Sequence, residues 1–184
     1  AGKIKHPHRL YSLEKTYDAS EVKSTFNIKT RKLDGACVAH VFDNGVYVKS
    51  ITRGTGEYGE DISHLFKHLY EDIMIGYFNV VSIVGECVTF QDVDNYRNYV
   101  AGAMGLDSLE EFKTRKIDFI AHDVLGVELP YTQRMGDIEP FFNTVLNEEL
   151  IKSVPSDGIV YRVNDFATCQ KLGYTSKYPK FAIA

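Results

Sequence analysis

The sequence lacks an excess of basic residues. Its 184 residues include 21 Lys and Arg against 25 Asp and Glu, so the net charge is −4 and the isoelectric point is about 5.9. A protein that grips nucleic acid through its own surface is usually basic, so this composition argues against strong nucleic-acid binding by the chain alone. Long apolar runs are also missing, because no segment approaches the roughly 20 residues of a membrane span.

Cysteines are few. Cys37, Cys87 and Cys169 are widely separated and form no C-x-x-C pair, which argues against a zinc ribbon or a disulfide framework. Sparse, unpaired cysteines suit a reducing compartment. Internal repeats and linkers are absent as well, so the length predicts a single domain.

The patterns that are present favour an α+β fold. Asn44-Gly45 between two apolar runs predicts a β-hairpin. Because the strands occur in hairpins and interrupted runs rather than as βαβ units, we expect antiparallel sheet. The expected strands cover residues 36–42, 46–52, 80–90, 117–125 and 159–163. The expected helices cover residues 19–24, 60–73, 108–116 and 137–151, and residues 92–104 are expected to form helix and loop. We expect residues 53–59 and most of 172–184 to be irregular.

A candidate nucleophile lies in the run Lys32-Leu33-Asp34-Gly35. A lysine amine attacks phosphorus only when it is neutral, and its unperturbed pKa is about 10.4, so it needs burial or cationic neighbours. Arg31 is adjacent, and Gly35 is expected to leave room for a ligand beside the strand. Taken alone, this tetrapeptide is also compatible with a solvated lysine entering a turn.

A second candidate is the glycine-rich stretch 54–59, which has the form G-x-G-x-x-G after a strand and before a helix. A dinucleotide fingerprint needs that strand in a parallel βαβ unit, with an acidic residue about 20 positions further on. Here the strand is the second arm of a hairpin, and Glu86 lies too far along the chain. We therefore rank a Rossmann oxidoreductase as a distant alternative.

Two further features concern charged and metal-ligating side chains. Glu86 follows Gly85 inside an apolar strand, where a carboxylate is costly unless it is hydrogen-bonded or faces a site. His64 and His68 lie one helical turn apart but have no evident third ligand, so a solvated helix face is the better interpretation. We expect no metal site built from protein side chains alone.

The order of these segments resembles the adenylation domain of NAD-dependent DNA ligases. Lys32-Leu33-Asp34-Gly35 matches the nucleophile motif of that family, and the resemblance extends from residue 6 to residue 184. The final block resembles L-G-x-T-S-x-x-P-R-W-A-I-A, which separates this family from ATP-dependent ligases. The matching segments are residues 7–13, 32–35, 52–61, 85–86, 95–102, 157–160 and 172–184.

The resemblance implies a fold and a reaction. The fold would be a nucleotidyltransferase (ATP-grasp-like) fold, with antiparallel sheets flanked by helices and the AMP pocket between them. In this family the lysine attacks the α-phosphorus of NAD and expels nicotinamide mononucleotide. AMP then passes to a DNA 5′-phosphate, and a 3′-hydroxyl displaces it to seal the nick. Magnesium is expected to screen the phosphates.

The resemblance also implies site residues. Lys32 would carry AMP, and Asp34 would orient it or a reacting group. Glu86 would accept hydrogen bonds from the ribose hydroxyls. Arg53 and Arg97 would bind phosphate or ribose. The residues expected to bind the cofactor are Ser12, Leu13, Arg53, Glu86, Arg97, His122 and Arg162.

Several positions depart from the family pattern. Thr30 stands where a glutamate usually contacts the adenine amino group, and His122 stands where a tyrosine usually stacks on adenine. Arg162 replaces the lysine of D-G-V-V-x-K, keeping the charge but not the geometry. Phe181 replaces a tryptophan. His122-Asp123 looks more like ATP-dependent DNA ligases and RNA ligases, which are therefore an alternative. A non-catalytic nucleotide-binding subunit with a vestigial pocket is another.

The 184 residues do not include several parts that the resemblance leads us to expect. These are the N-terminal nicotinamide-binding subdomain and the oligonucleotide-binding, zinc and helix-hairpin-helix parts. We therefore expect a trimmed piece or one subunit of a split ligase. The isolated chain is expected to bind adenine nucleotide but to adenylate itself slowly or not at all. Nicked DNA and a second subunit are the expected partners, without a membrane. The expected location is the cytoplasm of a bacterial cell or a phage-infected host.

Overall fold

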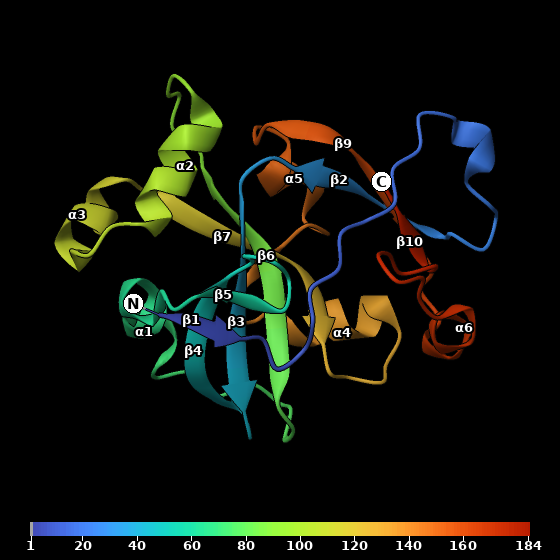
Figure 1. Ribbon diagram of the computed structural model, residues 1–184, viewed down its shortest axis with the longest axis horizontal. Coiled ribbons are helices and arrows are strands. Elements are labelled where there is room, and N and C mark those ends of the chain that lie inside the picture. Colours follow the sequence, from blue (N-terminus) through green and yellow to red (C-terminus); the bar gives the residue numbers. More distant parts are fainter. Residues whose placement is uncertain (1) are drawn as a thin grey trace.

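A five-stranded sheet forms the centre of the molecule in the computed structural model, which describes residues 2–184 (Figure 1). The strand order is β4-β3-β6-β7-β8, and all pairs are antiparallel except β7 with β8. The bounds are Ala36–Asp43 for β3, Val46–Thr52 for β4, Val81–Thr89 for β6, Ile117–Leu125 for β7 and Asn143–Thr144 for β8.

Two smaller sheets complete the strand structure. The three-stranded sheet has the order β10-β9-β2 and is fully antiparallel. A two-stranded antiparallel sheet joins β1 to β5. The bounds are Lys3–Lys5 for β1, Ile28–Leu33 for β2, Tyr58–Glu60 for β5, Ser156–Arg162 for β9 and Ala182–Ile183 for β10. The observed class is thus the expected α+β with antiparallel sheets.

The helices are short and lie around the sheets. In Figure 1, α2 and α3 lie on one side of the central sheet, and α4 and α6 lie on the other, near β10. Among the described residues, none of the helices combines the length and apolar character that a membrane crossing requires. The bounds are Ala19–Glu21 for a single 3₁₀ turn, Ser63–Tyr70 for α1, Tyr96–Met104 for α2, Leu109–Thr114 for α3, Tyr131–Ile138 for α4, Glu148–Ile151 for α5 and Phe166–Leu172 for α6.

Local signals account for the elements that were predicted correctly. Asn44 and Gly45 both have positive φ, as a two-residue hairpin between β3 and β4 requires. Ser108 caps α3 by accepting a hydrogen bond from the Glu111 amide at 3.2 Å. The predicted strand 117–125 coincides with β7.

The predicted helix over 137–151 is wrong. This stretch contains the end of α4, the short strand β8 and the short helix α5. Pro140 explains the break, because it lacks the amide that would continue the hydrogen-bond ladder of α4. The segment after α4 instead runs alongside β7, where Asn143 pairs with Ile120. The strand β1 and the helix α6 were not predicted.

The glycine-rich stretch is a tight connection between β4 and β5. Gly54 and Gly56 have φ of +55° and +92°. A Cβ on Gly54 would lie 2.1 Å from the Tyr58 carbonyl oxygen, and one on Gly56 would lie 2.2 Å from that of Leu10. The glycines are therefore needed for backbone packing. Tyr58 and Gly59, expected to be irregular, and Glu60, expected to begin a helix, form β5 against β1. The stretch therefore does not open a helix after a parallel strand.

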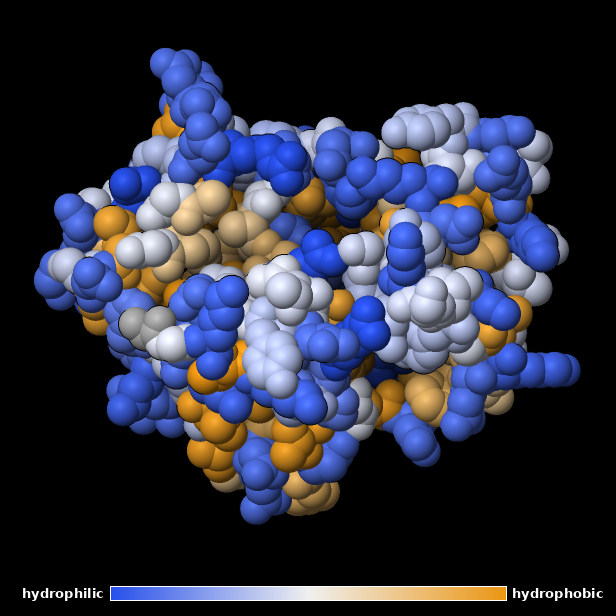
Figure 2. Space-filling view, in the orientation of Figure 1, coloured by the Kyte–Doolittle hydropathy of each residue, from blue (hydrophilic) through white to orange (hydrophobic). Residues whose placement is uncertain are grey.

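The main core lies between the central sheet and the helices α1 to α4. His40 of β3 is fully buried there among Phe66, Tyr70 and Phe119, with ring centroids 4.3 to 4.8 Å away. Figure 2 shows a mostly hydrophilic face, with apolar residues gathered at its lower edge.

Candidate functional site

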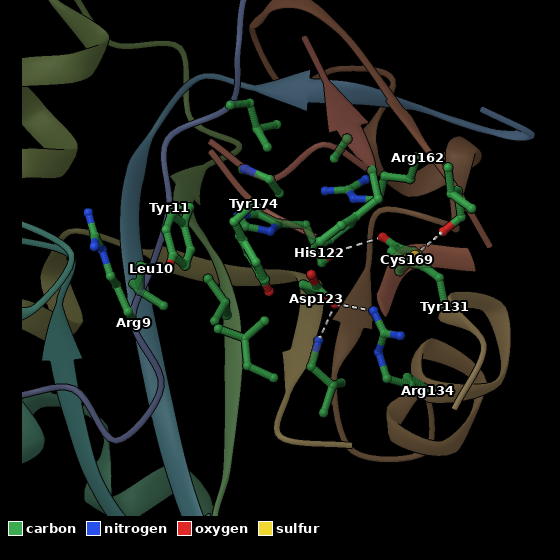
Figure 3. Close-up of a pocket in the computed structure, with 18 of the residues that line it drawn as sticks. Arg9, Leu10, Tyr11, His122, Asp123, Tyr131, Arg134, Arg162, Cys169 and Tyr174 are labelled. Carbon is green, nitrogen blue, oxygen red and sulfur yellow. Dashed lines mark hydrogen bonds and ion pairs between the residues drawn. The ribbon is translucent and has the colours of Figure 1, made fainter. Parts of the chain in front are cut away.

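A cavity of about 460 Å³ is lined by residues of both larger sheets (Figure 3). Its lining comes from the extended segment after β1, from the second half of β7, from α4 and α6, and from the last residues of the chain. The volume lies within the range of small-ligand pockets. The lining residues used below are Arg9, Tyr11, Leu13, Cys37, Arg53, His122, Asp123, Tyr131, Arg134, Arg162, Cys169, Tyr174 and Phe181.

One wall of the cavity is aromatic. The rings of Tyr11 and Tyr174 stack with their centroids 4.6 Å apart, and Figure 3 shows them side by side. Phe181 meets Tyr174 edge-on at 5.2 Å, and the Arg9 guanidinium lies 4.5 Å from the Tyr11 ring centre. Flat aromatic faces with a nearby cation suit a planar, electron-rich ring such as a nucleobase.

The opposite wall is charged. Arg134 of α4 donates to Asp123 of β7 at 2.8 Å, and Arg162 of β9 lies over the Tyr131 ring at 4.8 Å. Burial would raise the pKa of Asp123, but Arg134 and Arg162 outweigh burial and hold this pKa below its usual range. The Tyr131 hydroxyl donates to the His122 carbonyl at 2.6 Å, and burial raises its pKa to about 12. The wall therefore presents a fixed carboxylate between guanidinium groups.

Five of the predicted cofactor-binding residues meet at this cavity. Leu13, Arg53, His122 and Arg162 line it, although they come from distant parts of the sequence. Ser12 joins them because its Oγ accepts a hydrogen bond from Arg53 at 2.5 Å. The structure thus places close together residues that the sequence analysis grouped only by the order of their motifs along the chain.

Glu86 lies beside His122, with a carboxylate oxygen 3.4 Å from Nε2. The neighbouring strands explain this contact. Val84 pairs with Asp123 and Gly85 with Ala121, so His122 is an extra residue in β7 at a β-bulge. A bulge re-aims the side chain that it carries. Cys37 of β3 lies directly opposite Glu86 and is the third member of this group. Burial, and to a lesser extent the negative charge of Glu86, raises the pKa of the Cys37 thiol.

Arg162, which lines the cavity, contacts Thr30, the second residue that departs from the family pattern on these paired strands. Arg162 donates to the Thr30 hydroxyl at 2.9 Å, and both side chains are buried. Thr30 and Arg162 replace the glutamate and lysine that the family resemblance leads one to expect. Because the hydroxyl accepts from the guanidinium, the two departures form one structural unit.

Lys32 lies at a second, smaller cavity of about 330 Å³, whose lining includes Asp157 and Gly158. Its Nζ is 3.6 Å from an Asp157 carboxylate oxygen, with side chains 32% and 47% exposed. Lys32 is not on the wall of the larger cavity. The adjacent Arg31 is held by the carbonyl groups of Ile151 and Val154.

Asp34 and Arg97 form a third group. The Arg97 Nε lies 3.1 Å from an Asp34 carboxylate oxygen, so α2 is tied to the end of β2. The space beside Gly35 is filled by backbone rather than left free for a ligand, because a Cβ there would lie 2.2 Å from the Cys87 carbonyl oxygen. The expectation that Gly35 makes room for a ligand is therefore wrong.

Sequence reasoning did not identify Tyr131 and Arg134 because the helix was placed too late in the chain. Tyr11 and Tyr174 lie within segments quoted for the resemblance, yet no sequence signal pairs them. Of the two helical histidines, His64 has its Nε2 2.8 Å from the Leu106 carbonyl oxygen, so this contact competes with metal binding.

Comparison with known proteins gives two findings. A family model of the NAD-dependent DNA ligase adenylation domain matches residues 2–75 and 128–184. Similar proteins include DNA ligases from Campylobacter concisus, 31% identical, from Campylobacter jejuni serotype O:2, 30% identical, and from Flavobacterium psychrophilum, 22% identical. The alignments cover 98 to 99% of this chain but only 35 to 36% of those ligases. The first of them runs over 232 positions against 184 residues here, so that relative carries additional internal segments.

Proposed function

The chain belongs to the family of NAD-dependent DNA ligase adenylation domains, and from that premise we propose that Lys32 accepts AMP from NAD. The Nζ of Lys32 forms a bond to the α-phosphorus, and the bond from that phosphorus to nicotinamide mononucleotide breaks. The neutral amine loses one proton in this step, and the departing phosphate of nicotinamide mononucleotide takes it up. Asp34, two residues further along, is proposed to orient the reacting groups.

The observation that carries this proposal is the convergence at the larger cavity. Leu13, Arg53, His122 and Arg162 come from four separate segments and line one space next to the Tyr11–Tyr174 stack. A purine held on such a wall would leave its phosphates near the arginines, which bind them through charge-assisted hydrogen bonds. This arrangement supports a nucleotidyltransferase (ATP-grasp-like) fold with the AMP pocket between the antiparallel sheets.

In this proposal, Lys32 must leave its ion pair with Asp157 to reach the phosphate of the nucleotide. Its contact with Asp157 is a partly exposed pair at 3.6 Å, and such pairs contribute about 1 kcal/mol or less. The exchange therefore costs little compared with the electrostatic gain from a phosphate. Magnesium would be held mainly by the nucleotide phosphates, and the Asp157 carboxylate is the oxygen donor next to the nucleophile that fits it. The cation would offset phosphate charge.

The chain spans about a third of the length of the curated relatives that it matches. We infer that further domains or a second subunit bind the nicked DNA. The net charge of −4 agrees with this, because a negatively charged chain binds DNA weakly by itself. The proposed setting is the cytoplasm of a bacterial cell or a phage-infected host, where nick sealing serves DNA replication and repair.

One observation favours a second candidate function. The buried bond between Thr30 and Arg162 uses one donor of the guanidinium for a contact within the protein. A non-catalytic nucleotide-binding subunit of a split ligase tolerates such a bond, whereas a catalytic pocket must rearrange it. An ATP-dependent enzyme of the same superfamily is another alternative, because the pair His122-Asp123 resembles that group of ligases more closely.

The test is intact-mass spectrometry of the purified chain after incubation with magnesium and NAD, with ATP in parallel. We expect NAD to add one AMP group per chain, and Lys32→Ala to abolish the adduct. Lys29→Ala is the matched control, because Lys29 is an exposed lysine on the same strand and its loss leaves the adduct unchanged.

The other outcomes assign the alternatives. An adduct from ATP alone would move the chain to the ATP-dependent enzymes. No adduct from either donor, combined with nucleotide binding in calorimetry, would favour the non-catalytic subunit. An adduct that persists in Lys32→Ala would contradict the proposed nucleophile.

A further inference from the structure

Three side chains from adjacent strands of the central sheet converge next to the larger cavity. Cys37 of β3 and Glu86 of β6 are direct cross-strand partners, and His122 of β7 is the extra residue at the neighbouring bulge. Their sulfur, oxygen and nitrogen atoms all lie within 4.8 Å of one another. Ile120 is the direct partner of Glu86, so the alternation along β7 places His122, two residues further on, on the face that carries Glu86 and Cys37.

The three atoms match the preferences of zinc. Zn²⁺ takes thiolate, imidazole and carboxylate ligands at about 2.0 to 2.3 Å, so ligand atoms in a tetrahedral site lie about 3.3 to 3.7 Å apart. The contact of Glu86 with His122, at 3.4 Å, already has this spacing. Cys37 needs only a small approach, within the reach of a side-chain adjustment. We propose that Cys37, Glu86 and His122 form a binding site for Zn²⁺ or a similar borderline-soft divalent cation.

The surroundings support the proposal. A thiolate and a carboxylate together offset the charge of a divalent cation, and this pair of negative charges outnumbers the single positive charge of the nearby Arg53 guanidinium. Glu86 and His122 are mostly buried, with side chains 17% and 24% exposed.

The fourth position of the cation points to an accessible space. Cys37 and His122 both line the larger cavity, so water or a small anion can complete the coordination from there. Three protein ligands plus one exchangeable position is the arrangement of zinc sites that bind a further ligand, in contrast to closed structural sites.

The cation would also change how the cavity binds nucleotide. Glu86 and His122 are two of the residues proposed to hold AMP, and neither is free for that role while it ligates a metal. Zinc and nucleotide therefore compete. This competition rests on the proposed function, whereas the cation site does not.

The test is to titrate the purified chain with Co²⁺, which replaces Zn²⁺ and reports its ligands by absorption. We expect a tetrahedral cobalt spectrum with a thiolate-to-cobalt charge-transfer band, which one equivalent of Zn²⁺ removes. Cys37→Ser is expected to abolish the band. Cys169→Ser is the matched control and keeps it, because Cys169 lines the same cavity but lies outside the trio.

Two further variants keep the test decisive if Cys37→Ser does not fold. Glu86→Gln and His122→Gln are each expected to weaken zinc binding at least about tenfold, with folding verified by circular dichroism. The proposal is overturned by a missing charge-transfer band in the wild-type chain, or by a band that persists in Cys37→Ser. Zinc affinities unchanged in both glutamine variants would overturn it as well. The cobalt spectrum does not depend on AMP transfer. It therefore tests the metal site even if the chain does not transfer AMP.

Discussion

At the scale of single residues, burial decides what a polar side chain does. His40 is fully buried in an aromatic cluster, with its Nδ1 2.7 Å from the Ser50 hydroxyl and no partner for Nε2 among the described residues. Burial lowers the pKa of His40 to about 3, because a charged imidazolium would have to leave water. This histidine is thus a neutral core residue rather than a catalytic base.

We expect acid to destabilise the fold through His40. The unfolded chain binds this proton below pH of about 6.5, whereas the folded chain does so only near pH 3, so stability is complete above pH 6.5 and is lost as the pH falls towards 3. The slope is about 1.4 kcal/mol per pH unit, or about 2 kcal/mol between pH 6.5 and pH 5. Urea unfolding at the two pH values measures it. His40→Phe should reduce this dependence, and equal slopes in the two proteins would refute the assignment. His6 contributes with the same sign in both, because burial also lowers its pKa.

At the scale of elements, the pairing of β6 with β7 sets the geometry next to the site. A Cβ on Gly85 would lie 2.2 Å from the Ile120 carbonyl oxygen, so these two strands approach more closely than a side chain allows. The register shifts at this glycine, and His122 is the residue left over. Gly85 therefore indicates the close approach of another backbone, as a glycine inside a strand often does.

Gly85→Ala is expected to destabilise the domain by about 1 to 3 kcal/mol, because the added methyl group forces the backbone of β7 to move. The matched control is Gly136→Ala in α4, where a Cβ meets nothing within 4 Å and helix propensity improves by about 1 kcal/mol. Urea unfolding of both variants checks the prediction. A Gly85→Ala protein as stable as the wild type would show that β6 and β7 are not constrained at this point.

At the scale of the whole molecule, α4 connects the two larger sheets across the cavity. Arg134 binds Asp123 of β7, while the Tyr131 amide donates to the Asn164 carbonyl, just after β9, at 2.9 Å. The Tyr131 ring also lies beneath Arg162 of β9. The relative position of the two sheets, and with it the shape of the cavity, thus depends on this short helix.

Arg134→Ala is expected to cost about 3 kcal/mol, because it leaves the Asp123 carboxylate, 23% exposed, without its closest counter-charge. Lys152→Ala removes an exposed pair with Glu149 and should change stability by no measurable amount. Urea unfolding at neutral pH compares the two variants. Similar small losses in both would mean that Asp123 is adequately solvated without Arg134.

Much of the fold was predictable because its signals are local. The Asn44-Gly45 hairpin, the helix expected over 108–116 and the strand 117–125 depend on conformational preferences of a few neighbouring residues, and all three are confirmed. The helix over 137–151 failed because its apolar spacing was read across Pro140. Gly35 was misread because an added Cβ would meet the Cys87 carbonyl, which is distant in sequence.

The sequence by itself determined the family, the α+β class and the order of the residues that we propose to act on AMP. Only the tertiary structure decided which of them share a space. It separated Lys32, beside Asp157, from the cavity lined by His122 and Arg162, and it brought Cys37 next to Glu86. The reason is that strand register and bulges result from packing over the whole sheet, and a shift of one residue turns a side chain to the other face. No local pattern in the sequence fixes that choice.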